Sequence, residues 1–176
     1  LDTQDAIEDL RALMTKRLLP ELDADVHEAD ATSDDERVFL AEQLGSLHLT
    51  VIGDDDSGAA FYRQVLELSP GHAGAIDALS TLYEGSDRSE DLSALLLSTL
   101  EHEATPAGRG AILTRLAELA EEKQGDREQA IGYLMQALEE NPEGTEVYDA
   151  IERVQGDLGQ WEEVADLYLR RIDMAD

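Results

Sequence analysis

The chain has 176 residues, no cysteine, and a formal net charge of −28 from 41 acidic residues against 13 Lys and Arg. This charge excludes phosphate backbones and anionic membranes as expected partners, because both are bound by clustered basic side chains. The lack of Cys excludes disulfides and thiolate chemistry. A hydrophobic share of 42% suits a folded domain, and an aromatic share of 5% favours helices packed on helices over a β-sandwich.

The acidity itself has two interpretations. It could attract a basic protein, a peptide or a cation, with binding that weakens as salt rises. It could equally be a trait of solubility or of a salty habitat, which is the more common reason for such a charge. No apolar run reaches the ~18 residues of a membrane span, so we expect a soluble chain.

Apolar residues recur at helical spacing along the whole chain. In one stretch, Ile131, Leu134, Met135 and Leu138 follow the i, i+3, i+4, i+7 pattern of an amphipathic helix, and Gly or Pro residues separate such stretches. The sequence predicts an all-α fold with about nine helices. These lie near 2–18, 33–52, 55–68, 72–84, 88–103, 106–124, 127–140, 144–157 and 161–175.

Residues 1–32 form the first predicted region, a leading helix followed by an acidic connection. Eight acidic residues and no Lys or Arg lie between Glu21 and Glu36. Such a run is usually a solvated segment, although a short extra helix or a docking strip for a basic partner would also fit.

Helix starts are marked by capping residues. Thr32 or Ser33 before the acids near Glu36 predicts one start, and Thr105 before a proline predicts another. Asp54-Asp55-Asp56-Ser57-Gly58 has the look of a calcium loop, but its glycine arrives one position early and Val65 stands where the bidentate Glu belongs. We therefore expect these acids to cap a helix.

The sequence repeats itself at an offset of 72 residues. Gly53-Asp54 falls on Gly125-Asp126, and Pro70 falls on Pro142. Apolar positions agree as well, with Leu40, Leu44, Leu47, Leu95, Leu96 and Leu100 aligned on Ile112, Leu116, Leu119, Leu167, Tyr168 and Ile172. Arg37 also matches Arg109. This self-similarity predicts two equivalent blocks, 33–104 and 105–176, within one continuous repeat domain.

Each block divides into two helical hairpins. The turn at Gly53-Asp54 recurs 34 residues later at Asp87-Arg88, and the turn at Gly125-Asp126 recurs 34 residues later at Gly159-Gln160. A two-helix unit cannot bury its apolar stripe alone, so neighbouring hairpins must stack.

These hairpins resemble tetratricopeptide repeats (TPRs) over about residues 33–176. The second-helix pattern of the family, Ala followed by a large residue and then Pro, appears as Ala130, Leu134 and Pro142, and again as Gly58, Tyr62 and Pro70. The first-helix pattern is present as Ile76, Leu79, Ser80 and Tyr83, and more weakly from Tyr148 to Gln155. In the helices near 33–52 and 106–124 we expect the large-then-small pair of this pattern to be lost.

The resemblance implies a right-handed stack of antiparallel hairpins, an α-solenoid, that binds a partner protein or peptide on the face formed by successive first helices. The candidate partner-binding residues on that face are Gln43, Ser46, Arg115, Glu118, Glu122 and Arg153. Without a basic clamp, the face suits a basic or amphipathic ligand. The alternative is an architectural or self-assembling segment of a longer repeat protein.

No motif for catalysis, a cofactor or a metal emerges, and we expect no enzyme. His27, His48, His72 and His102 show no paired spacing and are expected at the surface. Trp161 is the only tryptophan, and we expect its ring to pack on the preceding helix.

The last helix does not resemble a polar cap. Val164, Leu167, Tyr168 and Ile172 form its main apolar stripe, while Ala165 and Leu169 lie to one side, where another repeat would dock. Because the chain begins at Leu1 without a partner for its leading helix, we expect flanking repeats or a second copy to cover the ends.

The acid excess yields a first prediction. Mutual repulsion should make the fold more stable in added salt, and more stable near pH 5 than at pH 9. Thermal melts across salt concentration and pH measure this directly. Flat melting temperatures would show that the charges are too dispersed to matter.

Overall fold

The computed structural model describes residues 33–175, with side chains through Ile172. Within that range it is all-α, and the helices lie in two compact units, one ending at Arg88 and one beginning at Ser89. The predicted helix near 2–18, the acidic connection and His27 lie outside the described residues. Equivalence of blocks 33–104 and 105–176 remains a prediction.

The first unit contains α3 (Asp34–Leu47), the π-helical turn η2 (His48–Ile52), α4 (Asp55–Leu68) and α5 (Ala73–Gly85). Ser33 caps α3 in the predicted position, and Glu36 bonds back to the Ser33 amide to complete a capping box. The helix predicted over 33–52 is thus an α-helix that widens into one π turn. It ends at Gly53, whose φ of 74° glycine adopts without steric cost.

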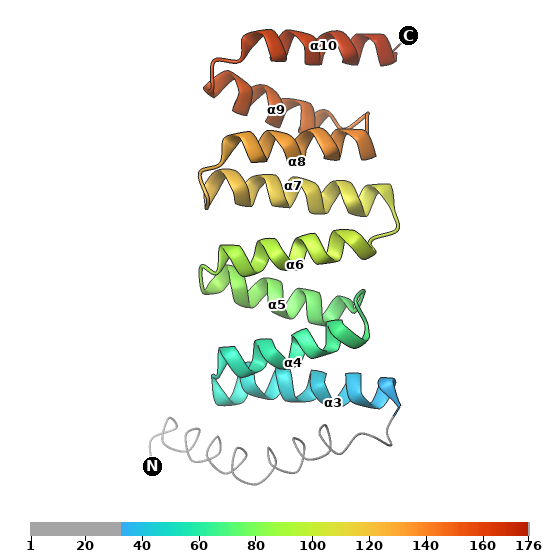
Figure 1. Cartoon of the computed structure of the whole chain (residues 1–176), viewed down its shortest axis with the longest axis vertical. Coiled ribbons are helices and arrows are strands. Elements are labelled where there is room, and N and C mark those ends of the chain that lie inside the picture. The colour runs from blue at the N-terminus through green and yellow to red at the C-terminus, as the bar shows by residue number, and fades with distance from the viewer. Residues whose placement is uncertain (1–32, 176) are drawn as a thin grey trace. The chain divides into compact units, whose positions relative to one another are not determined.

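The second unit contains α6 (Ser89–His102), α7 (Pro106–Glu122), α8 (Arg127–Glu140), α9 (Thr145–Asp157) and α10 (Trp161–Ala175). Helices within each unit follow one another in antiparallel hairpins, with each one packed on its neighbour in the chain (Figure 1). Thr105 caps α7, while Asp54 and Asp126 cap α4 and α8. The predicted caps are confirmed.

All four predicted hairpin turns share a left-handed residue. Gly53, Gly125 and Gly159 have φ of 74°, 68° and 74°, and Asp87 has φ of 56°. Asp tolerates this conformation better than most residues with a side chain. The repeat detected in the sequence is therefore also a repeat of backbone conformation.

Small residues allow the two helices of a hairpin to approach closely. A Cβ placed on Gly45 of α3 would lie 2.9 Å from the Tyr62 ring of α4. At the positions 72 residues later, Ala117 and Ala130 are both buried in the α7–α8 hairpin. Leu44-Gly45 and Leu116-Ala117 are thus buried large-then-small pairs, so the expectation that this pair is lost was wrong.

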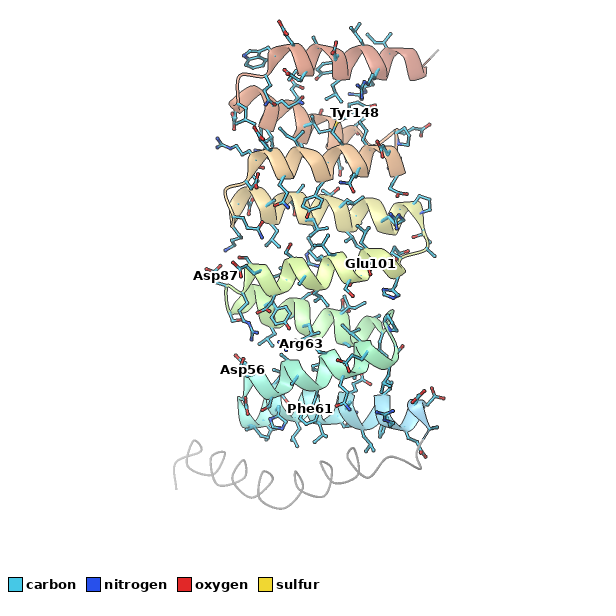
Figure 2. All side chains as sticks on the ribbon, viewed as in Figure 1. Asp56, Phe61, Arg63, Asp87, Glu101 and Tyr148 are labelled. Carbon is cyan, nitrogen blue, oxygen red and sulfur yellow. The ribbon has the colours of Figure 1, made fainter. Side chains whose placement is uncertain are left out.

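The core of the second unit lies between α7, α8, α9 and α10. Its buried members are Ala117, Ala120, Ala130, Leu134, Leu138, Tyr148, Ile151 and Leu167. Figure 2 labels Tyr148 where α9 faces its neighbours. Burial of Ala130, Leu134 and Tyr62 confirms the predicted hairpin register, whereas Leu66 is half-buried.

His48 corrects the expectation of surface histidines. It is buried in the π turn, with its ring 5.3 Å from the ring of Phe61 and its Nδ1 3.6 Å from a carboxylate oxygen of Asp54. His72 is half-buried and caps α5 through Nδ1, while His102 is exposed. The single extra residue of a π turn shifts the helix register, which helical spacing in the sequence does not reveal.

Ala130→Arg tests the packing. A cation at this fully buried position would have no partner, so unfolding free energy should fall by about 3 kcal/mol or more. Gly132→Arg is the matched control, because an added side chain there meets open space on the same helix. Urea unfolding of both variants measures the difference, and equal stabilities would contradict the assigned register.

Candidate partner-binding face

The first helices of the second unit, α7 and α9, border a groove of about 350 Å³. Small side chains from the first turns of α7 form one wall, and the end of α8 with the start of α9 forms the other. The lining residues are Ala107, Gly110, Ala111, Thr114, Ala137, Asn141, Glu143, Gly144, Thr145, Glu146 and Val147.

The absence of large side chains on α7 creates this hollow. Gly110 faces the carbonyl oxygen of Ala137, which would lie 3.8 Å from a Cβ at that position. Ala107 and Ala111 are exposed on the same side. The groove therefore offers backbone and methyl surface at close range, which suits an extended or helical peptide segment with side chains of its own to insert.

The groove has an acidic rim. Glu143 and Glu146 are exposed, and the residues that line the groove include no Lys or Arg. Asn141 and Thr145 add neutral polar groups beside them. Such a rim attracts positively charged groups and repels carboxylates or phosphates.

An ion pair joins the same two helices toward their other ends. Arg153 of α9 donates two hydrogen bonds to Glu121 of α7, from Nη1 to Oε1 at 2.7 Å and from Nη2 to Oε2 at 2.8 Å. The hydrogen bonds from Arg153, more than its charge, hold the pKa of Glu121 below its usual value. The same bonds raise the pKa of Arg153, and the charges of Asp157 and Glu122 add to that effect.

The structure brings together part of the predicted site. Glu118, Glu122 and Arg153 are exposed on α7 and α9, and Arg115 is half-buried on α7. Arg153 is engaged by Glu121, so it orients the two helices as well as facing solvent. Gln43 and Ser46 belong to α3 in the other unit.

Ser46 is turned toward its own hairpin. Burial is the main cause that raises the pKa of Tyr62, and a hydrogen bond with Ser46 opposes that rise. Gln43 is exposed on α3. Of the two, Gln43 is the residue whose side chain is available to a ligand.

Sequence reasoning missed the groove residues themselves. Ala107, Gly110, Ala111 and Val147 carry no chemistry that marks a site, and attention went to charged positions further along α7. The available signal was the run of small residues that opens this helix, Ala107-Gly108 and Gly110-Ala111, where a packed helix would carry a larger residue.

The structure also places Trp161. Its ring lies against Gly156 of α9, where a Cβ would be 3.1 Å from the indole, so it packs on the preceding helix as predicted. It nevertheless remains largely exposed. Within residues 33–175, no group of three or more His, Asp or Glu side chains is placed to hold a metal ion, and no helix is long and apolar enough to cross a membrane.

Comparison with known proteins agrees with this geometry. Residues 112–144, which run from α7 through α8 to the start of α9, match the sequence profile of the tetratricopeptide repeat. No curated protein matches the chain.

Solved structures share the fold at low sequence identity. A crystal structure of MamA is 15% identical, with 90% of this chain and 91% of that chain covered and a TM-score of 0.54. Another MamA structure is 20% identical, with 98% and 92% covered and a TM-score of 0.53. YrrB, described as a TPR protein with an unusual peptide-binding site, is 18% identical, with 79% and 69% covered and a TM-score of 0.50.

The hairpins, their turns and these matches define an all-α helical-repeat fold. The chain is a tetratricopeptide-like repeat protein.

The Glu121–Arg153 pair should contribute stability that depends on pH. Because its folded-state pKa is lowered, ionised Glu121 stabilises the fold above its usual pKa, and this is lost as pH falls through the lowered value. Arg153 is well exposed, so the contribution should be only ~0.5 kcal/mol.

A double-mutant cycle with Glu121→Gln and Arg153→Met, measured by urea unfolding, isolates this coupling. It should be present at neutral pH and vanish near pH 3. Glu118→Gln is the control, since it removes one exposed carboxylate of α7 and should show no coupling to Arg153. A coupling independent of pH would contradict the assignment.

Proposed function

We propose that this protein is an interaction scaffold that binds a partner protein or peptide in the groove between α7 and α9. The observation that carries the proposal is the groove itself, a hollow of about 350 Å³ between two successive first helices. It is the face on which the family resemblance places ligands. The peptide-binding site named for YrrB supports the same class of function.

The chemistry of the groove favours a basic or amphipathic ligand. Glu143 and Glu146 stand at its rim, and further carboxylates on α7, Glu118 and Glu122, continue the acidic surface. A Lys or Arg side chain would meet this rim, while small apolar side chains would fit against Ala107 and Ala111. The Glu121–Arg153 pair holds the two helices together beside the groove and so keeps it preformed.

Peptide arrays that vary Lys, Arg and apolar content provide the probe. The best basic amphipathic peptide, labelled for fluorescence anisotropy, should bind the full chain with an affinity that falls as salt rises. Ala111→Arg should weaken binding about tenfold or more, because it fills the groove and repels the basic ligand. Reversing the rim with Glu143→Lys and Glu146→Lys should weaken it as well.

Gly132→Arg is the matched control, since it adds the same side chain to an open position on α8 that is not among the groove residues. It should leave affinity unchanged. If Ala111→Arg and Gly132→Arg behave alike, the groove is not the binding site. If acidic peptides compete as well as basic ones, the proposed ligand class is wrong.

A further inference from the structure

The outer face of α10 carries an exposed apolar stripe. Trp161, Leu169 and Ile172 are 64%, 59% and 60% exposed. Ala165 and Tyr168 lie between them on the same side of the helix, because all five positions follow helical spacing. The stripe is separate from the α7–α9 groove, none of whose lining residues belongs to α10.

Only part of the predicted main stripe faces inward. Val164 and Leu167 are buried, whereas Tyr168 and Ile172 are exposed, contrary to the sequence prediction for the last two. Ala165 and Leu169 are exposed on the side where another element was expected to dock. An aromatic and aliphatic surface of this kind is typical of helix-docking sites.

An internal reference shows what covers such a face. The 72-residue repeat aligns α10 with α6, and α7 packs against α6 within the same unit. Leu96 of α6 is 3% exposed, while its equivalent in α10, Tyr168, is 37% exposed. Leu100 is half-buried, while its equivalent is Ile172. The face that is covered on α6 is open on α10.

The contact between α6 and α7 also has a polar component. Arg109 of α7 donates from Nη1 to the backbone carbonyl oxygen of Leu100, near the carboxyl end of α6, at 3.0 Å. This carbonyl and the helix dipole both favour a cation at that end. The carbonyl of Ile172 occupies the equivalent place in α10. Glu162 and Asp166 are exposed beside the apolar stripe, which further favours a basic partner.

We propose that the outer face of α10 docks an amphipathic helix of a partner protein, with an arginine positioned over the carboxyl end of α10 as Arg109 is over that of α6. The apolar stripe of the incoming helix would cover Leu169, Ile172 and Trp161. Its arginine would bond the carbonyl of Ile172. A second copy of this chain is a less suitable occupant, because its acidic flanks would face Glu162 and Asp166.

The probe is a peptide with the sequence of residues 104–124, which contains α7, its Thr105 cap and Arg109 but no tryptophan. Added to the full chain, it should cause a saturable blue shift in the fluorescence of Trp161, the only tryptophan. A peptide with Arg109→Glu should bind about tenfold more weakly, since it loses the carbonyl contact and meets acidic flanks.

The protein variant Leu169→Gln with Ile172→Gln should lower affinity for the first peptide about tenfold or more while keeping its melting temperature, because both side chains are exposed. Leu97→Gln is the matched control, an exposed apolar residue on α6 whose loss should not change affinity. Ala111→Arg should also leave this binding unchanged, which separates the α10 face from the groove.

A fusion removes any dependence on the helicity of the free peptide. Residues 104–141 appended after Asp176 should raise the melting temperature and shift Trp161 fluorescence to the blue. Failure of both the peptide and the fusion would overturn the proposal. Binding insensitive to the Leu169 and Ile172 substitutions would also overturn it, as would self-association, measured by light scattering, that those substitutions abolish.

Discussion

The fold depends on how closely the two helices of each hairpin can approach. Gly45 lies against the ring of Tyr62, and Gly58 lies against Leu49, so neither position has room for a Cβ without movement of its neighbour. Ala117 and Ala130 serve the α7–α8 hairpin in the same way. With small residues at the crossing, Leu44, Val65, Leu116 and Leu134 can interlock around it, and the apolar stripes of both helices become buried.

That close approach determines what remains available for binding. The inner sides of α7 and α8 are used by their hairpin, so ligands can reach only the sides of the helices that neither hairpin nor neighbouring helix covers. One such surface is the groove of α7 and α9, which is small-residue and acidic. The other is the outer side of α10, which is apolar and aromatic. The two surfaces differ in chemistry and should select different partners.

Much of the fold could be predicted from the sequence because its boundaries are set by local chemistry. Ser33, Asp54, Thr105 and Asp126 cap helices through their own side chains, and Gly53 ends one through its left-handed conformation. The burial of His48 could not be predicted, since it follows from a π turn. Arg37 and Arg109 align in sequence, yet Arg109 bonds Glu140 at 2.6 Å while Arg37 pairs with Asp34, because Leu68 stands where Glu140 would be. The groove escaped prediction because it is made by missing side chains.

The left-handed turns carry a trace of how the chain arose. Asp87 follows Gly53 at the same interval that separates Gly159 from Gly125, but the interval from Asp87 to Gly125 is four residues longer. Simple tandem copying of one hairpin would leave equal intervals and glycine at every turn. Alternating intervals, with Asp87 in the second turn, indicate that the last ancestral duplication copied a pair of hairpins already different from each other. Natural variants of this protein should therefore gain or lose repeats two hairpins at a time.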